Sequence, residues 1–315
     1  MSFLLLLIGF FFLIKGADLF VEGAASIARK FNVPAMIIGL TIVAMGTSAP
    51  EAAVSITSSL AGQNDMSVAN VVGSNFFNIL VVLGVSSILA KLPVQEDTIK
   101  KDTPFLLLVS ALLLLFGFNL NIGRIEGIIF LVLFAYFLVN TIINAKKSSS
   151  NSDAEAEVAA ELEASSEDSI IKTIILSVIG VIGIVLGGDM VVDSATSIAT
   201  TFGMSANLVG LTIVAVGTSL PEFVTSVVAI KKGETEIAIG NVIGSNIFNI
   251  LLVLGLATAI NPINISIFAL IDIVFMVAIT ILLYIFMKKD NCIVKKQGFI
   301  LVAIYVIYMA YTIFR

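Results

Sequence analysis

The chain has 315 residues, of which 58% are hydrophobic, and its mean hydropathy is +1.10. A soluble domain is only about 45–50% apolar, and many stretches here hold 18 or more mostly apolar residues, enough to cross a bilayer. The net charge of −5 arises largely in one acidic linker, so the sequence excludes a soluble or nucleic-acid-binding protein and predicts an all-α polytopic membrane protein.

Ten apolar spans are predicted along the chain, and the charges between them indicate their orientation. With the N-terminus outside, the cytoplasmic loops hold 14 lysines and arginines, whereas the outer side holds only Arg124 and Arg315. Positive residues gather in cytoplasmic loops, so we expect a cell-membrane protein with both termini outside and a cytoplasmic central linker. The spans are 3–28, 35–61, 66–90, 103–118, 125–144, 171–199, 205–230, 236–260, 265–287 and 293–313.

Two stretches of the chain occur twice at the same offset of 171 residues. Residues 39–51 and 210–222 are identical at 11 of 13 positions, and residues 70–84 and 241–255 at 12 of 15. Each copy contains five predicted spans, and an odd number turns the second copy upside down. The sequence therefore predicts two inverted five-helix repeats with a site between them near the bilayer midplane.

The predicted organisation has three parts. Residues 1–145 form the first repeat and residues 171–315 the second, inverted repeat. The segment 146–170 joins them as an acidic cytoplasmic linker with seven acidic residues, and it lacks the ligand spacing of a calcium-binding loop. We read it as a solvated connection.

Each copy of the first motif sets a glutamate, Glu51 or Glu222, directly after a proline in an apolar span. A charge inside the membrane is costly and needs a partner, and two like charges call for a cation. Gly46 and Pro50 should break the second span near mid-membrane, which would free backbone carbonyl oxygens as ligands. The oxygen ligands expected from the two copies are those of Ala44, Thr47, Ser48, Glu51, Ala215, Thr218, Ser219 and Glu222.

The second motif adds Ser74 with Asn78, and Ser245 with Asn249. Members of each pair are four residues apart, so both side chains lie on one helix face. The combined set contains only oxygen ligands, which suits hard cations such as Ca²⁺ and Na⁺. The alternative interpretation is that these small polar residues only join helices in the membrane, but it does not account for the repeated Pro-Glu pairs.

Other polar residues in the spans are weaker candidates. We assign Asn75 and Asn246 to packing or helix–helix hydrogen bonds, and the same reading applies to Asn70 and Asn241. Two further acidic pairs could line an access path or hold structural bonds. These pairs are Asp18 with Glu22 and Asp189 with Asp193.

The chain has no histidine and a single cysteine, Cys292. It therefore has no intrachain disulfide and no cysteine cluster for zinc or iron–sulfur. The commonest general base in enzymes is also missing. We expect neither enzyme activity nor a cofactor.

GTSAPE and GTSLPE, each followed by a GSNxFN motif, resemble the alpha repeats of the calcium/cation antiporter superfamily. The match is closest to its prokaryotic sodium/calcium exchangers and covers nearly the whole chain. The resemblance implies exchange of Ca²⁺ for Na⁺ by alternating access, through four clustered cation positions. It also implies that the first and sixth spans move against the other eight. We expect the chain to function as a monomer.

The resemblance also implies a role for each motif residue. Glu51 and Glu222 would hold Ca²⁺ together with Thr47 and Thr218. Asn78 and Asn249 would complete a central, hydrated position; several relatives carry Asp where Asn249 stands, so the number of Na⁺ per Ca²⁺ stays open. The two sodium positions would be formed by Ala44, Ser48 and Ser74 on one side and by Ala215, Ser219 and Ser245 on the other.

Three other functions remain open. A proton/calcium antiporter typically has an acidic residue in the second motif, where this chain has Gly73-Ser74 and Gly244-Ser245. A potassium-dependent sodium/calcium exchanger would share the all-oxygen site. A passive cation channel is the weakest alternative, because the inverted repeat favours alternating access.

Overall fold

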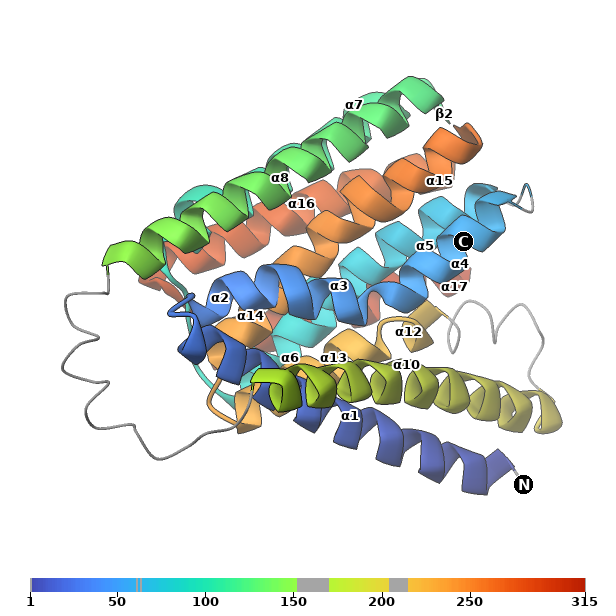
Figure 1. Cartoon of the computed structure of the whole chain (residues 1–315). Coiled ribbons are helices and arrows are strands. Elements are labelled where there is room, and N and C mark those ends of the chain that lie inside the picture. Colours follow the sequence, from blue (N-terminus) through green and yellow to red (C-terminus); the bar gives the residue numbers. More distant parts are fainter. Residues whose placement is uncertain (1, 61, 63, 152–169, 204–214, 315) are drawn as a thin grey trace, which may run out of the picture.

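The protein is a bundle of helices, seen in a computed structural model (Figure 1). The description covers residues 2–60, 62, 64–151, 170–203 and 215–314. Most of the predicted linker, residues 152–169, lies outside the described residues, as do residues 205–214 of the predicted seventh span and residues 210–214 of its motif.

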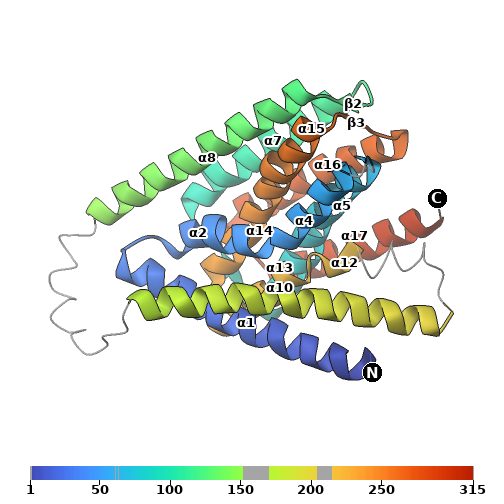
Figure 2. The same cartoon turned by 45° about the vertical axis from the view of Figure 1, so that its right-hand side comes forward.

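The helices α1 (Ser2–Lys30) and α10 (Ile170–Thr201) run side by side along one edge of the bundle (Figures 1 and 2). Glycines let their backbones touch. A Cβ added at Gly16 would lie 2.7 Å from the carbonyl oxygen of Gly180, and one added at Gly180 would lie 2.8 Å from that of Gly16. Close backbone packing through small residues is a usual way for helices to associate in lipid, and it makes α1 and α10 a tightly joined pair.

Six helices among the described residues are long and apolar enough to cross a membrane, and a bent pair would make a seventh. The bent pair, Ala35–Thr47 with Ala49–Leu60, changes direction by 49°. The chain is therefore a multi-pass membrane protein. The six are Ser2–Lys30, Ser67–Leu89, Arg124–Ala145, Ile171–Thr201, Thr235–Ile260 and Ile267–Lys289.

The bent pair is built from four short segments. A first turn, α2 (Ala35–Ile38), leads into a π-helical stretch, η1 (Gly39–Val43), and α3 (Ala44–Thr47); after Ser48 the chain continues as α4 (Ala49–Leu60). The second copy has the same break after α12 (Ala215–Gly217), where Thr218 and Ser219 precede α13 (Leu220–Lys231).

Two buried helices form the centre of the bundle, between the α1–α10 pair and the opposite edge (Figure 2). The first runs through α5 (Asn64–Phe77), η2 (Asn78–Val82) and α6 (Leu83–Leu89). The second runs through α14 (Thr235–Phe248), η5 (Asn249–Leu254) and α15 (Gly255–Ile260). Both π-helical stretches begin at repeat-related asparagines, Asn78 and Asn249, and π-turns often mark functional sites.

The remaining helices pack around the two central helices. They are η3 (Thr98–Asp102) with α7 (Thr103–Gly117), α8 (Arg124–Asn151), α16 (Ile267–Asp290) and α17 (Lys295–Phe314). The predicted fifth span ended at residue 144, whereas α8 continues to Asn151.

Two short antiparallel strand pairs join loops from the two halves of the chain. The strand β1 (Leu92–Pro93) pairs with β4 (Cys292–Ile293), and β2 (Asn121–Ile122) pairs with β3 (Ile263–Asn264). Adding 171 to the residue numbers of β1 gives β3, and adding it to β2 gives β4. If each strand is replaced by its counterpart in the other half, the pair β1–β4 becomes the pair β3–β2. The two strand pairs are therefore related by the repeat.

Candidate cation-binding site

The two motif glutamates lie at the two breaks in the helices. Glu51 is in the first turn of α4 and Glu222 in the first turn of α13, and both side chains are fully buried. Prolines cause the breaks, because the nitrogen of Pro50 cannot donate a hydrogen bond to the preceding turn, and Pro221 repeats this. Each carboxylate thus sits at a helix N-terminus, where the helix dipole favours negative charge.

Serine hydroxyls cross between the halves to reach the glutamates. The Oγ of Ser48 donates to Oε1 of Glu222 at 2.9 Å, and the Oγ of Ser219 donates to Oε1 of Glu51, also at 2.9 Å. Each serine lies at one break and binds the glutamate of the other. The two breaks therefore face each other, although 171 residues separate them in sequence.

The serines of the second motif complete the set around each carboxylate. The Oγ of Ser74 donates to Oε1 of Glu51 at 3.3 Å, and the Oγ of Ser245 donates to Oε1 of Glu222 at 3.4 Å. Both serines are buried in the central helices. Each Oε1 thus accepts one hydroxyl from its own half and one from the other half.

The threonines lie at the same breaks. The Oγ1 of Thr47 donates within its own helix to Val43 and Ala44, and it lies 3.0 Å from Oδ1 of Asn241 in the other half. The Oγ1 of Thr218 lies 3.4 Å from Oδ1 of Asn70, which is the repeat-related contact. Both threonines are buried.

The alanine carbonyl groups behave differently in the two copies. The break does not open the helix at Ala44, whose carbonyl oxygen accepts from the N–H of Ser48 at 3.0 Å. A carbonyl oxygen has two lone pairs, so this helical bond leaves one for a cation. In the second copy the N–H of Ser219 donates to Val216 instead, at 3.2 Å. The first break therefore keeps a helical bond from residue i to residue i−4. The second break closes with a bond from residue i to residue i−3, which makes a tighter turn.

Four buried carboxylate and amide oxygens of the motif residues accept no hydrogen bond from any described residue. They are Oε2 of Glu51, Oε2 of Glu222, Oδ1 of Asn78 and Oδ1 of Asn249. All four atoms can only accept, if the glutamates are ionised. Leaving a buried acceptor unsatisfied costs about 1–3 kcal/mol, and more if it is charged. A bound cation would supply the missing partner for these two repeat-related pairs of oxygens.

Asn70 and Asn241, which the sequence assigned to packing or helix–helix hydrogen bonds, bond directly to the helices that carry the glutamates. The Nδ2 of Asn70 donates to Oγ of Ser55 at 2.9 Å and to the carbonyl of Glu51 at 3.3 Å. The Nδ2 of Asn241 makes the equivalent bonds to Ser226 and Glu222. Asn70 and Asn241 thus hold the two glutamate turns, and they also contact the two threonines. The sequence feature that could have indicated this role is their exact repetition at the 171-residue offset.

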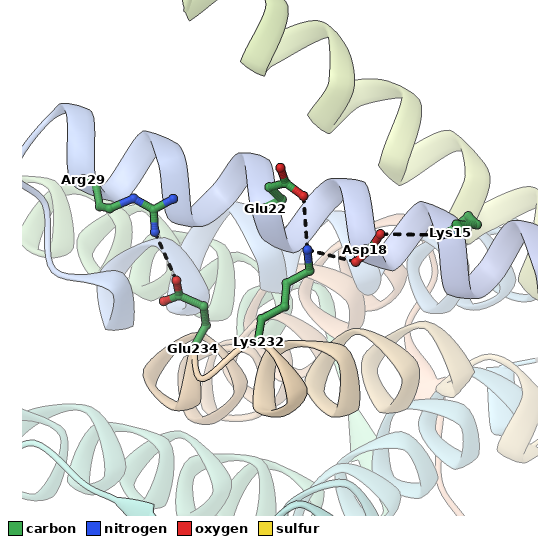
Figure 3. A network of polar contacts seen from close by, with 6 residues as sticks. All are labelled: Lys15, Asp18, Glu22, Arg29, Lys232 and Glu234. Carbon is green, nitrogen blue, oxygen red and sulfur yellow. Dashed lines mark hydrogen bonds and ion pairs between the residues drawn. The ribbon is translucent and has the colours of Figure 1, made fainter. Parts of the chain in front are cut away.

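The weaker acidic candidates lie away from the glutamates. Lys232 contacts Asp18 at 2.9 Å and Glu22 at 3.1 Å, and Arg29 pairs with Glu234 (Figure 3). Partial burial lowers the pKa of Lys232, but the hydrogen bonds and charges of its two partners outweigh this effect and raise the pKa. These pairs fasten α1 to the turn between α13 and α14. The counterparts on α10, Asp189 and Asp193, are exposed.

No group of three or more acidic, histidine or cysteine side chains gathers at one point among the described residues. The candidate site therefore has two carboxylates, surrounded by hydroxyl and amide oxygens. A buried site of this composition suits a hard cation rather than a transition metal.

The fold and the site together define a multi-pass membrane protein with a buried, all-oxygen candidate site for a cation. The chain matches the model of the sodium/calcium exchanger protein family over residues 1–143 and 172–314, and it belongs to that family. Its relatives are transporters, and the chain is not an enzyme.

The similarity extends over most of the length of each relative. The chain is 36% identical to the sodium/calcium exchanger MaX1 of Methanosarcina acetivorans, covering 98% of this chain and 97% of the relative. It is 43% identical to the putative antiporter CaxA of Alkalimonas amylolytica over 81% of this chain and 80% of the relative. A solved structure of the sodium-calcium exchanger NCX_Mj superimposes with a TM-score of 0.86 at 32% identity, covering 98% of both chains.

Proposed function

We propose that this protein is a secondary active antiporter that exchanges Ca²⁺ for Na⁺ across the cell membrane by alternating access. The observation that carries the proposal is the set of four buried acceptor oxygens without hydrogen-bond partners among the described residues. They belong to two carboxylates and two amides related by the repeat. Membership of the sodium/calcium exchanger family supports the choice of ions.

The ligand types favour Ca²⁺ and Na⁺ over other cations. Carboxylate, hydroxyl and amide oxygens suit hard cations, and Ca²⁺ accepts flexible coordination by six to eight oxygens. Mg²⁺ keeps several of its waters and would fit a dry protein site poorly. Two glutamates would neutralise one Ca²⁺ or two Na⁺, so the two ions would compete for the same carboxylates.

Each motif residue has a proposed position. Glu51 and Glu222 hold Ca²⁺, assisted by Thr47 and Thr218, and the amide oxygens of Asn78 and Asn249 complete the central position. The crossed hydroxyl bonds support sodium positions on both flanks, since each joins residues from the two halves. The bonds group Ser48 with Ser245 at Glu222, and Ser219 with Ser74 at Glu51, which differs from the grouping that the resemblance implied. The proposed sodium positions are therefore Ala44, Ser48 and Ser245 on one flank and Ala215, Ser219 and Ser74 on the other.

We infer that the architecture comprises ten spans in two inverted five-helix repeats, residues 1–145 and 171–315, joined by the acidic linker 146–170. The exchange of strand pairings under the 171-residue offset supports this. In the proposed topology β1 and β4 both lie on the cytoplasmic side, and β2 and β3 both lie outside. The linker is then cytoplasmic and both termini are outside. One chain holds both halves of the site, so the working unit is a monomer.

Charge supplies a reason for obligatory exchange. The two carboxylates leave an unloaded site with a charge of −2, and closing it away from water would cost several kcal/mol. One Ca²⁺ or two Na⁺ bring the net charge to zero, and three Na⁺ bring it to +1. Loaded forms can therefore switch between the two sides, whereas the unloaded form cannot. We propose that α1 and α10 move together against the remaining helices, and their backbone contact at Gly16 and Gly180 supports a rigid pair.

Potassium-dependent exchange is the second candidate, because residues of this chain resemble such a protein. The human sodium/potassium/calcium exchanger 4 is 37% identical over 37% of this chain, which is 20% of that protein's length. Proton-coupled exchange and a passive channel are further alternatives.

One experiment separates these functions. Purified protein is reconstituted into sodium-loaded liposomes, and ⁴⁵Ca²⁺ uptake is measured with and without an outward Na⁺ gradient, with K⁺ present or absent, and with an outward proton gradient instead. The proposal expects uptake that follows the Na⁺ gradient and needs no K⁺. Uptake that is indifferent to the Na⁺ gradient would indicate a channel or a proton-coupled antiporter.

A further inference from the structure

Two asparagines next to the candidate site, Asn75 and Asn246, form amide-to-amide bonds across the halves. The Nδ2 of Asn249 donates to Oδ1 of Asn75 at 3.1 Å, and the Nδ2 of Asn78 donates to Oδ1 of Asn246 at 3.1 Å. All four side chains are buried. Each candidate ligand asparagine is therefore bonded, through its nitrogen, to an asparagine of the opposite half.

These bonds determine which end of each ligand amide stays available. An amide side chain has one accepting and one donating end of almost equal size. Since the nitrogens of Asn78 and Asn249 are used by their partners, their Oδ1 atoms are the ends left over. Both oxygens are buried and accept no bond from a described residue. A cation requires the oxygen end, because the NH₂ end would repel it.

The orientation of Asn75 is itself set by the main chain. Its Nδ2 donates to the carbonyl oxygen of Asn246 at 3.3 Å and contacts the sulfur of Met276 at 3.6 Å. A carbonyl oxygen can only accept, so the nitrogen of Asn75 must face it and Oδ1 must face Asn249. A chain of bonds thus runs from a backbone carbonyl through Asn75 to the amide of Asn249.

We propose that Asn75 and Asn246 are positioning residues that hold the amide oxygens of Asn249 and Asn78 toward the transported cation. This rests on the proposed function, in which those oxygens are cation ligands. Outer partners of metal ligands commonly change metal affinity by about 10–100-fold when they are removed. The sequence assigned these asparagines to packing or helix–helix hydrogen bonds, and the structure gives each a specific bonded partner in the opposite half.

The two chains of bonds are unequal. The Nδ2 of Asn246 has no hydrogen-bond partner among the described residues, so no equivalent main-chain bond sets its orientation. Asn249 is therefore held through a fixed partner, and Asn78 through one that can turn more easily. We expect the loss of Asn75 to weaken Ca²⁺ binding more than the loss of Asn246.

The test compares the effect of Asn75→Ala in two backgrounds. In the natural chain, Asn75→Ala lets the amide of Asn249 turn its nitrogen toward the cation, and the Kd for ⁴⁵Ca²⁺ should rise by about tenfold or more. In an Asn249→Asp background the carboxylate presents an oxygen in either orientation. There, Asn75→Ala should change the Kd less than about threefold.

A merely structural role for Asn75 predicts another pattern. Loss of a helix–helix bond would lower the Tm and the yield of folded protein equally in both backgrounds, without a change in Kd that depends on residue 249. Thr280→Val serves as the control, since Thr280 is buried and donates only to the carbonyl of Met276. If Asn75→Ala does not fold, Asn75→Ser in the same two backgrounds replaces it.

The outcomes separate the positioning role from the proposed function. Equal increases of Kd in both backgrounds, or no increase in either, would overturn the positioning role. Natural protein that binds no ⁴⁵Ca²⁺ would overturn the proposed site itself. Binding without Na⁺-driven uptake would overturn the exchange function while leaving the test of Asn75 valid.

Discussion

The hydroxyl of Ser48 donates to Oε1 of Glu222 at 2.9 Å, which joins the break in one half of the chain to the carboxylate of the other. The equivalent bond from Ser219 to Glu51 has the same length. Neither half can therefore form its carboxylate environment alone. A change at one break should therefore alter the binding of ions on both sides of the site.

Removing a crossed hydroxyl should weaken Na⁺ coupling. Ser48→Ala and Ser219→Ala each delete a bond to a carboxylate, worth about 1.5–3 kcal/mol, as well as a proposed Na⁺ ligand. The Na⁺ concentration for half-maximal Ca²⁺ exchange should rise by roughly tenfold in either variant. Ser110→Ala is the control, because Ser110 donates only to its own helix at Leu106. An unchanged Na⁺ dependence in both variants would exclude the serines from the sodium positions.

Close packing at Gly244 should be needed for stability. A Cβ added there would overlap the carbonyl oxygen of Leu40 and lie 2.7 Å from Cβ of Ala44. Gly244→Ala should therefore lower the Tm, with a cost of about 1–3 kcal/mol. Gly188→Ala is the control, because its added methyl would lie 3.6 Å from Cγ of Pro221, which is an ordinary contact. Equal Tm values for the two variants would show that this helix contact adapts freely.

Movement of α1 against the core can be tested at the ion pair of Figure 3. The charged atoms of Glu22 and Lys232 are 3.1 Å apart, and the natural Cys292 is buried. In the double variant Glu22→Cys, Lys232→Cys, a short bis-methanethiosulfonate linker should stop ⁴⁵Ca²⁺ uptake, and a reducing agent should restore it. Each single variant, treated in the same way, should retain uptake. Full uptake by cross-linked protein would mean that α1 stays fixed to α13 during transport.

Asp102 should make stability depend on pH. Burial, followed by the charge of Asp97, raises the pKa of Asp102 from 3.8 to about 6, against the opposing effects of Lys101 and Thr98. The carboxyl is outside the predicted spans. The folded state holds the proton more tightly than the unfolded state, so stability falls as the pH rises from about 4 to 6 and stays lower above that range.

The variant Asp102→Asn should remove this dependence. At pH 7 it should be more stable than the natural chain, on the order of 1–3 kcal/mol, and near pH 4 the two should have similar Tm values. Thermal unfolding in detergent at a series of pH values measures the difference. Glu96→Gln, at an exposed residue paired with Lys100, provides the comparison. A Tm difference that does not vary with pH would argue against the buried carboxyl as its source.

Much of the fold follows from local features of the sequence. Long apolar runs bounded by charges predict the helices, and Pro50 and Pro221 predict the breaks, because a proline removes a backbone donor wherever it occurs. Duplication at an offset of 171 predicts that Glu51 and Glu222 share one environment. All of these depend on residue type and spacing alone.

Other features depend on how the halves pack. The bond from Ser48 to Glu222 joins residues 174 positions apart, and no local pattern specifies which hydroxyl reaches which carboxylate. The sequence assigned Asn75 and Asn246 to packing or helix–helix hydrogen bonds, but it could not name their partners, because these lie in the other half of the chain. The break was expected to open the helix at Ala44, but the N–H of Ser48 keeps its helical bond to that carbonyl.

The central claim is that Glu51 and Glu222 form one site at which Ca²⁺ and Na⁺ compete, and equilibrium binding of ⁴⁵Ca²⁺ to the purified protein tests it most directly. We predict one Ca²⁺ per chain, complete displacement by Na⁺, and loss of binding in Glu51→Gln and in Glu222→Gln, with both variants folded. Ca²⁺ that stays bound at saturating Na⁺, or that binds normally to either folded variant, would contradict the account.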